Sequence, residues 1–321
     1  MTKDTMRITV SDGIQLAVHR WLPEGKPAAI MQISHGMGEY AMRYDRFAEA
    51  AVGSGCAVLA ADHRGHGETA GALDRLGYLG DSDGFTRVME DQHEITCRIR
   101  DELPDVPVVL LGHSFGSLIA QLYMERYGYL LDGCILSGTR GPTPVTARSG
   151  HLVSAMVGLL RGWKTPSPFL DGLLFGSYNR RIPDAESPNS WLTRDADEVA
   201  KYDASPWSGF VCSAGFYRDL TGGLTVIHSR KMLGSIPRDL PVFIFGGTED
   251  PVGDYGKTPA RLAALYARLG IGKLEVKLYP GARHELLNET NRDEATSDIL
   301  SWTAKVTATA RILPLTEDTN L

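Results

Sequence analysis

The chain has 321 residues, of which 43% are hydrophobic and 22% are charged. This length and composition fit one large globular domain or two small ones. The formal net charge of −6 and the sequence pI of about 5.9 argue against nucleic acid as a partner, because surfaces that bind nucleic acid are basic.

The N-terminal residues and the cysteines both indicate a cytoplasmic protein. The opening stretch MTKDTMRITVSDG is polar and lacks the apolar core of a secretory signal. No apolar run approaches the roughly 20 residues that a membrane span needs. The four cysteines are scattered without paired spacing, at Cys56, Cys97, Cys134 and Cys212. We therefore expect reduced thiols, with neither a disulfide framework nor a zinc site.

Hydrophobic periodicity predicts strands that alternate with helices along most of the chain. Residues 6–23 form two alternating runs joined by Ser-Asp-Gly, which is a β-hairpin signal. Apolar runs typical of buried strands follow at 28–36 and 56–62, and further strands are predicted at 106–114, 131–138, 240–247 and 273–281. Helical spacing recurs at 44–55, 86–103, 117–128, 259–270 and 295–306. This order predicts an α/β fold whose mostly parallel sheet is covered by helices on both faces and begins with an antiparallel hairpin.

The interval from residue 140 to residue 236 breaks this alternation. It contains seven prolines before the sheet resumes, at positions 142, 144, 166, 168, 183, 188 and 206. Its apolar stretches have helical spacing, and it is too long to be a loop. We therefore expect a helical cap at 140–236, inserted into a core formed by 1–139 and 237–321.

A serine stands between two glycines in Gly112-His113-Ser114-Phe115-Gly116, after a predicted central strand and before a predicted helix. Parallel sheets bind ligands at the carboxyl ends of their strands. A G-x-S-x-G turn in this place exposes the serine hydroxyl, and the N-terminus of the helix offers backbone N–H groups to developing negative charge. The alternative is a serine that only caps the helix.

A serine hydroxyl becomes a useful nucleophile only when a base takes its proton and an acid orients that base. In this type of fold the chain order is serine, acid, histidine. Glu249 and Asp250 follow a predicted strand, and His284 follows the next one and is the only histidine after these acids. We therefore predict a triad of Ser114, Asp250 and His284.

Five motifs resemble those of the α/β-hydrolases of the monoacylglycerol lipase and lysophospholipase type, which include serine aminopeptidase-like proteins. These motifs are SHGMGEY, DHRGHGET, GHSFGS, GGTEDPV and GARHELLNE, and together they span nearly the whole chain. The resemblance implies an α/β-hydrolase fold with a cap and no cofactor. It implies Ser114 as the nucleophile, Asp250 as the acid and His284 as the base. It further implies that the backbone N–H groups of Met37 and Phe115 form the oxyanion hole.

This chain departs from the family's pattern at Tyr40, Met42, Phe115 and Ser117. We expect Glu39 and Tyr40 to lie near the substrate at the mouth of the pocket. The resemblance implies that the substrate is a small-molecule carboxylic ester of a single fatty acyl chain. It leaves open a lysophospholipase, a short-chain carboxylesterase, an aminopeptidase and a ligand-binding protein without catalysis.

Three further features have more than one interpretation. His63 and His66 could bind a metal, but no third ligand is close in sequence, so we expect none. Glu39 and Arg43 are four residues apart and form either an ion pair or two solvated charges. A helical face in 151–163 carries Leu152, Val153, Met156, Val157, Leu160 and Trp163. We expect this face to line the pocket, with transient membrane contact as the second interpretation.

Five acidic residues of the cap could hold the free amino group of a peptide in an aminopeptidase: Asp184, Glu186, Asp195, Asp197 and Glu198. They lie in polar stretches, so we expect them to face solvent. Because the acid limb of the reaction depends on a neutral His284, we expect an apparent pKa of about 6–7.

Overall fold

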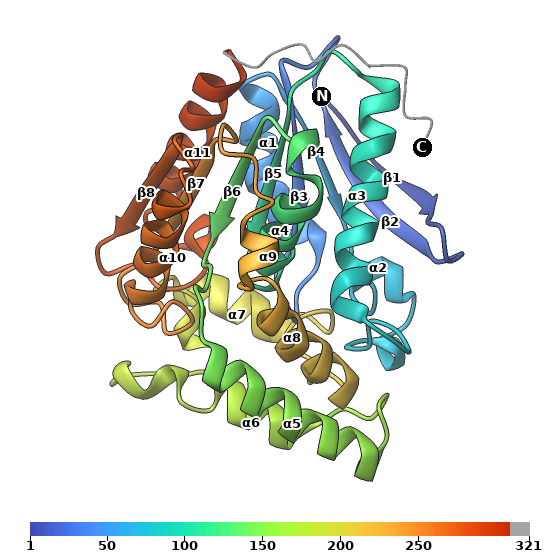
Figure 1. Ribbon diagram of the computed structural model, residues 1–321, viewed down its shortest axis with the longest axis vertical. Coiled ribbons are helices and arrows are strands. Elements are labelled where there is room, and N and C mark those ends of the chain that lie inside the picture. Colours follow the sequence, from blue (N-terminus) through green and yellow to red (C-terminus); the bar gives the residue numbers. More distant parts are fainter. Residues whose placement is uncertain (309–321) are drawn as a thin grey trace.

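The computed structural model describes residues 1–308, and its centre is an eight-stranded sheet (Figure 1). The strands are β1 (Thr2–Thr9), β2 (Gln15–Leu22), β3 (Ala29–Ser34), β4 (Cys56–Ala61), β5 (Val108–His113), β6 (Gly133–Ser137), β7 (Val242–Gly247) and β8 (Leu274–Tyr279). Their order across the sheet is β1-β2-β4-β3-β5-β6-β7-β8. The β1–β2 hairpin and the β2–β4 pair are antiparallel, and the remaining pairs are parallel. The predicted α/β class is therefore confirmed.

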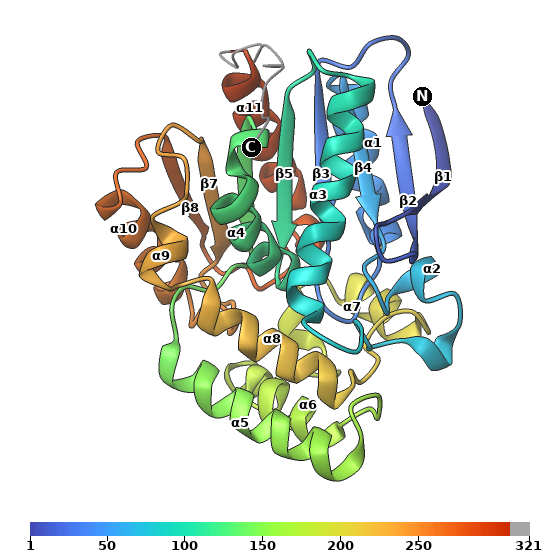
Figure 2. The same cartoon turned by 45° about the vertical axis from the view of Figure 1, so that its right-hand side comes forward.

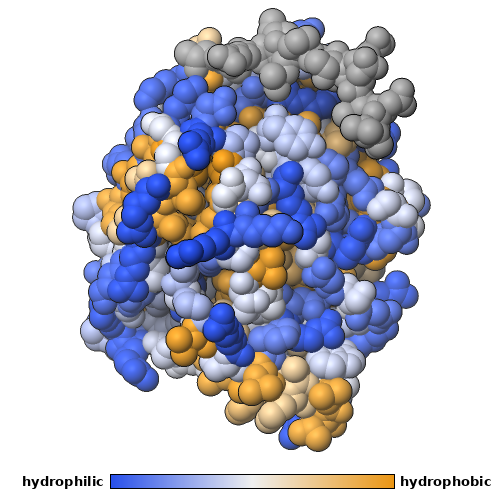
Figure 3. Space-filling model, viewed as in Figure 1, coloured by the Kyte–Doolittle hydropathy of each residue, from blue (hydrophilic) through white to orange (hydrophobic). Residues whose placement is uncertain are grey.

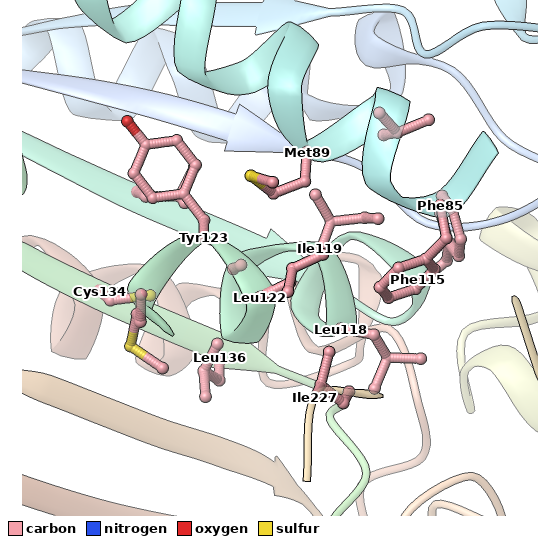
Figure 4. Packing of buried hydrophobic residues seen from close by; sticks show 14 of the residues in the cluster. Phe85, Met89, Phe115, Leu118, Ile119, Leu122, Tyr123, Cys134, Leu136 and Ile227 are labelled. Atoms are coloured by element: carbon pink, nitrogen blue, oxygen red, sulfur yellow. The ribbon is translucent and has the colours of Figure 1, made fainter. Parts of the chain in front are cut away.

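Alternation along the central strand builds a hydrophobic core on each face of the sheet. Val108 and Leu110 of β5 join the cluster that packs against α3 (Gly84–Glu102), α4 (Phe115–Tyr127) and α10 (Lys257–Arg268). Val109 and Leu111 join the opposite cluster, which packs against α1 (Asp45–Gly53) and α11 (Arg292–Thr307). Figure 4 shows the first cluster between α3, α4 and β6. Because both faces of the sheet are covered, β5 is apolar at each position from Val108 to Leu111.

The remaining helices are mostly inserted between β6 and β7. They are α5 (Pro144–Arg161), α6 (Pro168–Phe175), α7 (Ala196–Ala204), α8 (Ala214–Val226) and the short α9 (Arg230–Leu233); α2 (Gly67–Ala70) follows β4. Helices α5 to α8 lie together beyond the carboxyl ends of the parallel strands (Figures 1 and 2). We call residues 140–236 the cap, and we keep the boundaries of core and cap as a prediction.

Charged side chains attach the cap to the core at both ends of the sheet edge. Asp219 of α8 accepts a hydrogen bond at 2.9 Å from the backbone N–H of Gly84, the first residue of α3. This contact also suits the positive end of the α3 dipole. Glu198 of α7 pairs with Arg46 at 3.0 Å, and Asp195, the N-cap of α7, pairs with Arg292 at 2.6 Å.

Candidate active site

Ser114 lies in the sharp turn between β5 and α4. Its backbone has φ 52° and ψ −118°, and its N–H donates to the carbonyl of Ser137 on β6 at 2.9 Å. Positive φ is uncommon for residues with a side chain and is tolerated where the surrounding structure enforces it. A Cβ on Gly116 would lie 1.9 Å from the carbonyl oxygen of Ser34, and one on Gly112 would lie 2.4 Å from that of Gly116. The two glycines therefore permit the turn that presents the serine.

Asp250 and His284 come from the loops after β7 and β8 and are joined by a hydrogen bond. His284 Nδ1 is 3.0 Å from Asp250 Oδ2, and both side chains are buried. The other oxygen of Asp250 accepts from the N–H of Val252 at 2.9 Å. Burial alone would lower the pKa of His284, but the charge of Asp250 and its hydrogen bond outweigh burial and raise that pKa above its usual value.

Ser114 and His284 line one cavity, although no hydrogen bond joins their side chains. His284 Nε2 is buried and has no hydrogen-bond partner within residues 1–308. Catalytic hydrogen bonds are often long before substrate binds and tighten in the complex. Glu249, the neighbouring acid, is exposed and does not line the cavity.

The turn after β3 carries Met37 and lies against Ser114. A Cβ on Gly36 would lie 3.3 Å from Ser114 Cβ. The N–H groups of Met37 and Phe115 have no acceptor in the part of the chain that the structure describes. The turn is stiffened from within, because Glu39 Oε1 accepts from the N–H of Gly36 at 2.5 Å.

A buried ion cluster links this turn to the loop that carries His284. Arg43 donates to Glu39 at 2.7 Å and binds both carboxylate oxygens of Glu285 at 2.6 and 2.7 Å. Burial would raise the pKa of Glu285, but the charge of Arg43 lowers it to about 2. The ion pair between Glu39 and Arg43 is thus formed, and Tyr44 also donates to Glu39 at 2.9 Å. Sequence reasoning missed Glu285; its place directly after His284 in GARHE was the available signal.

The cavity has a volume of about 330 Å³ and is lined mainly by apolar side chains. These come from α4, α6 and α8 and from the loops, and they include Leu118, Leu174, Phe175, Trp191, Phe210, Leu220, Leu224 and Val252. Arg140 and Asp171 are charged groups at its wall, and Asp171 accepts a hydrogen bond from Tyr217 at 2.8 Å. A pocket of this size and lining suits one apolar chain next to a small polar group.

Two expectations about this cavity differ from the structure. Tyr40 does not line it. Glu39 lines it as expected, but its carboxylate is already engaged by Arg43, Tyr44 and a backbone N–H. The helical face in 151–163 does not line it either. Leu152, Met156 and Leu160 are exposed, whereas Val153 and Val157 pack against the core cluster. The reason is that α5 packs along α8, and α8 lies between α5 and Ser114. The hydrophobic periodicity of α5 could not show this.

The histidines of the DHRGHG loop support the turn instead of gathering around a metal. His35 Nε2 accepts from the N–H of His63 at 2.9 Å, and His66 Nε2 accepts from the N–H of Gly38 at 3.3 Å. Burial lowers the pKa of His66 to about 4, so it accepts as a neutral ring. Within residues 1–308 no group of three or more His, Cys, Asp or Glu side chains is placed to hold a metal ion.

Comparison with known proteins matches this geometry to a family. The model of the family described as "Serine aminopeptidase, S33" matches residues 25–291. The chain is 30% identical to "Monoglyceride lipase" of Mus musculus over 96% of this chain and 93% of that protein. It is 28% identical to "Monoacylglycerol lipase" of Mycolicibacterium smegmatis over 90% and 93%. The solved carboxyl esterase of Bacillus coagulans, in complex with glycerol, superposes with a TM-score of 0.88 at 28% identity over 96% and 99%.

The parallel sheet, the serine turn and the inserted cap define an α/β-hydrolase. The chain belongs to the serine aminopeptidase S33 family of that fold, which confirms the resemblance seen in its five motifs. No helix within residues 1–308 is both long and apolar enough to cross a membrane.

Proposed function

We propose that this protein hydrolyses carboxylic esters of a single fatty acyl chain, in the manner of a monoacylglycerol lipase, through a Ser114–His284–Asp250 triad. The observation that carries the proposal is the apolar cavity of about 330 Å³, which holds Ser114 and His284 together under the cap. Similarity to its relatives identifies the chain as a serine ester hydrolase, because several of them are named monoglyceride lipases or carboxyl esterases.

In the proposed reaction the Ser114 hydroxyl attacks the ester carbonyl while His284 Nε2 takes its proton. Asp250 holds the opposite ring nitrogen and stabilises the imidazolium that forms. The N–H groups of Met37 and Phe115 donate to the oxyanion of the tetrahedral intermediate. His284 then returns the proton to the leaving alcohol. Water, activated by the same histidine, hydrolyses the acyl-enzyme and regenerates the serine.

The lining and volume of the cavity support a preference for monoacylglycerols over di- and triacylglycerols. Each buried methylene is worth about 0.8 kcal/mol, or roughly four-fold in affinity. When that binding energy is retained in the transition state, kcat/KM rises with chain length until the cavity is full. The volume lies near the lower end of the range for ligand pockets, which favours one chain over two or three.

The proposal is tested by hydrolysis rates across monoacylglycerols from acetyl to long chains, with di- and triacylglycerols, lysophospholipids and amino-acid anilides in parallel. We expect kcat/KM to climb from short to medium chains and then level off. Rates that peak at acetyl or butyryl esters and decline steadily above them would identify a short-chain carboxylesterase instead.

The aminopeptidase alternative has less support from the cavity. None of the five cap acids considered for it lines the cavity. Asp195 and Glu198 are instead paired with arginines of the core. Asp171 is the cap carboxylate at the cavity wall, and it already accepts a hydrogen bond from Tyr217. Lysophospholipids remain in the substrate panel, because a head group at the mouth is not distinguished by the apolar lining.

We further propose that the cap contacts membranes transiently through the outer faces of α5 and α6. Large hydrophobic side chains are exposed there: Val145, Leu152, Met156, Leu159, Leu160, Phe169 and Leu173. Figure 3 shows apolar residues gathered at the lower end of the molecule, where Figure 1 places these helices. Apolar patches of this kind mark interaction surfaces.

Vesicle sedimentation tests the membrane proposal. The double variant Leu159→Gln, Leu160→Gln should bind phosphatidylcholine vesicles several-fold more weakly and still hydrolyse a soluble ester normally. Tyr129→Gln, which removes an exposed side chain of the core outside the cap, is the control. Equal binding by all three proteins would contradict membrane contact at this face.

We also propose a cytoplasmic location. The support is that all four cysteines are free and three of them are buried, as expected where thiols stay reduced. Localisation of a tagged full-length chain by cell fractionation tests this proposal, and recovery in a secreted or membrane-integral fraction would contradict it.

A further inference from the structure

We propose that Tyr202, on the cap helix α7, is a positioning residue for the reaction, because it holds the turn that carries Met37. The inference rests on the proposed role of the Met37 N–H in the oxyanion hole. It adds that the geometry of this donor is set from outside the core, by the cap.

The contact is a hydrogen bond to the residue after the donor. Gly38 follows Met37, and its carbonyl accepts from the Tyr202 hydroxyl and from the N–H of Gly209, each at 2.9 Å. Its N–H donates to His66 Nε2 on the core side at 3.3 Å. Gly38 is thus held from the cap through its carbonyl and from the core through its N–H. Gly38 has φ +66°, a conformation open to glycine and adopted here between these partners.

The aromatic ring of Tyr202 makes a second contact with the same apparatus. The Arg43 guanidinium lies 4.7 Å from the centre of this ring, within the range of a cation–π interaction. Arg43 in turn holds Glu39 of the turn and Glu285, the residue after His284. The buried side chain of Tyr202 therefore contacts both the turn that carries the Met37 N–H and the arginine that binds the residue after His284.

The helix that carries Tyr202 is itself fixed to the core. Glu198 and Asp195, on the same α7 segment, pair with Arg46 and Arg292. These pairs restrict how far the Tyr202 hydroxyl can move relative to Gly38. Without these ion pairs, α7 would move more freely and Tyr202 would hold the turn less firmly. Through Tyr202, a small displacement of α7 would shift the turn that carries the Met37 N–H, although α7 is distant in sequence from every residue of the proposed triad.

Tyr266 of α10 provides a matched control. It is a buried tyrosine that does not line the cavity, and its hydroxyl has no hydrogen-bond partner among the described residues. Tyr202→Phe removes one hydroxyl and keeps the ring beneath Arg43, whereas Tyr266→Phe removes a buried hydroxyl that holds nothing. The two variants make the same chemical change, and only the first removes the hydrogen bond to Gly38.

The experiment measures burst and steady-state hydrolysis of p-nitrophenyl acetate, whose acyl group is too short to fill the cavity, and the rate constant of inactivation by a fluorophosphonate. The phosphoryl oxygen of that reagent takes the place of the oxyanion. A hydrogen bond of ordinary net strength corresponds to about 2- to 10-fold in rate. We expect Tyr202→Phe to lower kcat and the inactivation constant together by about this factor, with KM nearly unchanged. Tyr266→Phe should change neither.

The burst amplitude counts correctly folded sites, so partial misfolding of Tyr202→Phe lowers the amplitude and leaves the rate per site measurable. Unchanged kcat and inactivation constants in Tyr202→Phe would overturn the inference, as would an equal loss in Tyr266→Phe or a loss confined to KM. Ser114→Ala, run in parallel, distinguishes failure of the inference about Tyr202 from failure of the proposed function. A burst retained by that variant would refute the proposed nucleophile, whatever Tyr202→Phe shows.

Discussion

Two adjacent acids follow β7, and only Asp250 reaches the histidine. Its side chain is buried and bonded to His284, whereas Glu249 is exposed. Asp250→Asn should therefore lower kcat by orders of magnitude, up to about 10⁴-fold, because the amide favours the wrong tautomer of His284. Glu249→Gln should cost less than about three-fold by steady-state assay. A larger loss in Glu249→Gln than in Asp250→Asn would show that the acid is misassigned.

The pH dependence follows from the same pair. His284 must be neutral to accept a proton, and Asp250 raises its pKa above the ordinary value of 6.5. The acid limb of kcat/KM should therefore have its midpoint above that value, at or beyond the upper part of the range expected from sequence. His113 and His66 titrate far lower, with pKa values of about 3 and about 4, so we expect one transition.

The control for this profile is Asp250→Asn, measured on its residual activity. Removing the carboxylate charge should move the acid limb to lower pH, since burial then dominates the pKa of His284. Prolonged treatment with EDTA should leave both profiles unchanged. An unmoved limb in Asp250→Asn, or activity that EDTA removes and zinc restores, would contradict this account.

Helix α4 does more than present the serine, because it also buries an acid. Both oxygens of Glu125 are buried without a partner in the described residues, and burial raises the pKa of this carboxyl to about 9. Between its ordinary pKa of 4.5 and about 9, the unfolded chain is ionised here and the folded chain is not. The free energy of unfolding should therefore fall as pH rises, by up to about 1.4 kcal/mol per pH unit.

Glu125→Leu removes this dependence and keeps a buried side chain of similar size. Its Tm should exceed that of the parent at pH 8, and the gain should be smaller at pH 5. Differential scanning calorimetry at both pH values measures it. An identical gain at the two pH values would mean that packing, and not the ionisation of Glu125, decides the effect.

The elements were predictable where one physical signal dominated. Strands β3 to β7 are mainly apolar runs, the edge strand β8 alternates apolar with charged residues, and helices α1, α3 and α10 carry an amphipathic stripe. The cap was harder. Its α5 is amphipathic in sequence, but its packing partner α8 comes about 60 residues later, and the period of α5 alone did not reveal which face that partner covers. The remaining apolar face of α5 is exposed, where pocket lining had been expected.

For the molecule as a whole, the class of site could be predicted from the sequence. The long-range contacts that hold the site in place could not. Five short motifs fixed the order and types of residues around Ser114. Arg43 meets Glu285 across 242 residues, and Tyr202 meets Gly38 across 164. Such contacts depend on how the cap and the loops after β8 fold back over the sheet. The motifs around Gly38 and Glu285 mark these residues, but no local pattern says which distant side chain each one meets.

The central claim is that Ser114 is the covalent nucleophile, and mass spectrometry of the fluorophosphonate-treated protein tests it most directly. We expect one adduct per chain, on the peptide that contains Ser114, and none in Ser114→Ala, whose kcat should fall by about 10⁴-fold or more with its Tm preserved. An adduct on another serine, or full labelling of Ser114→Ala, would contradict the account.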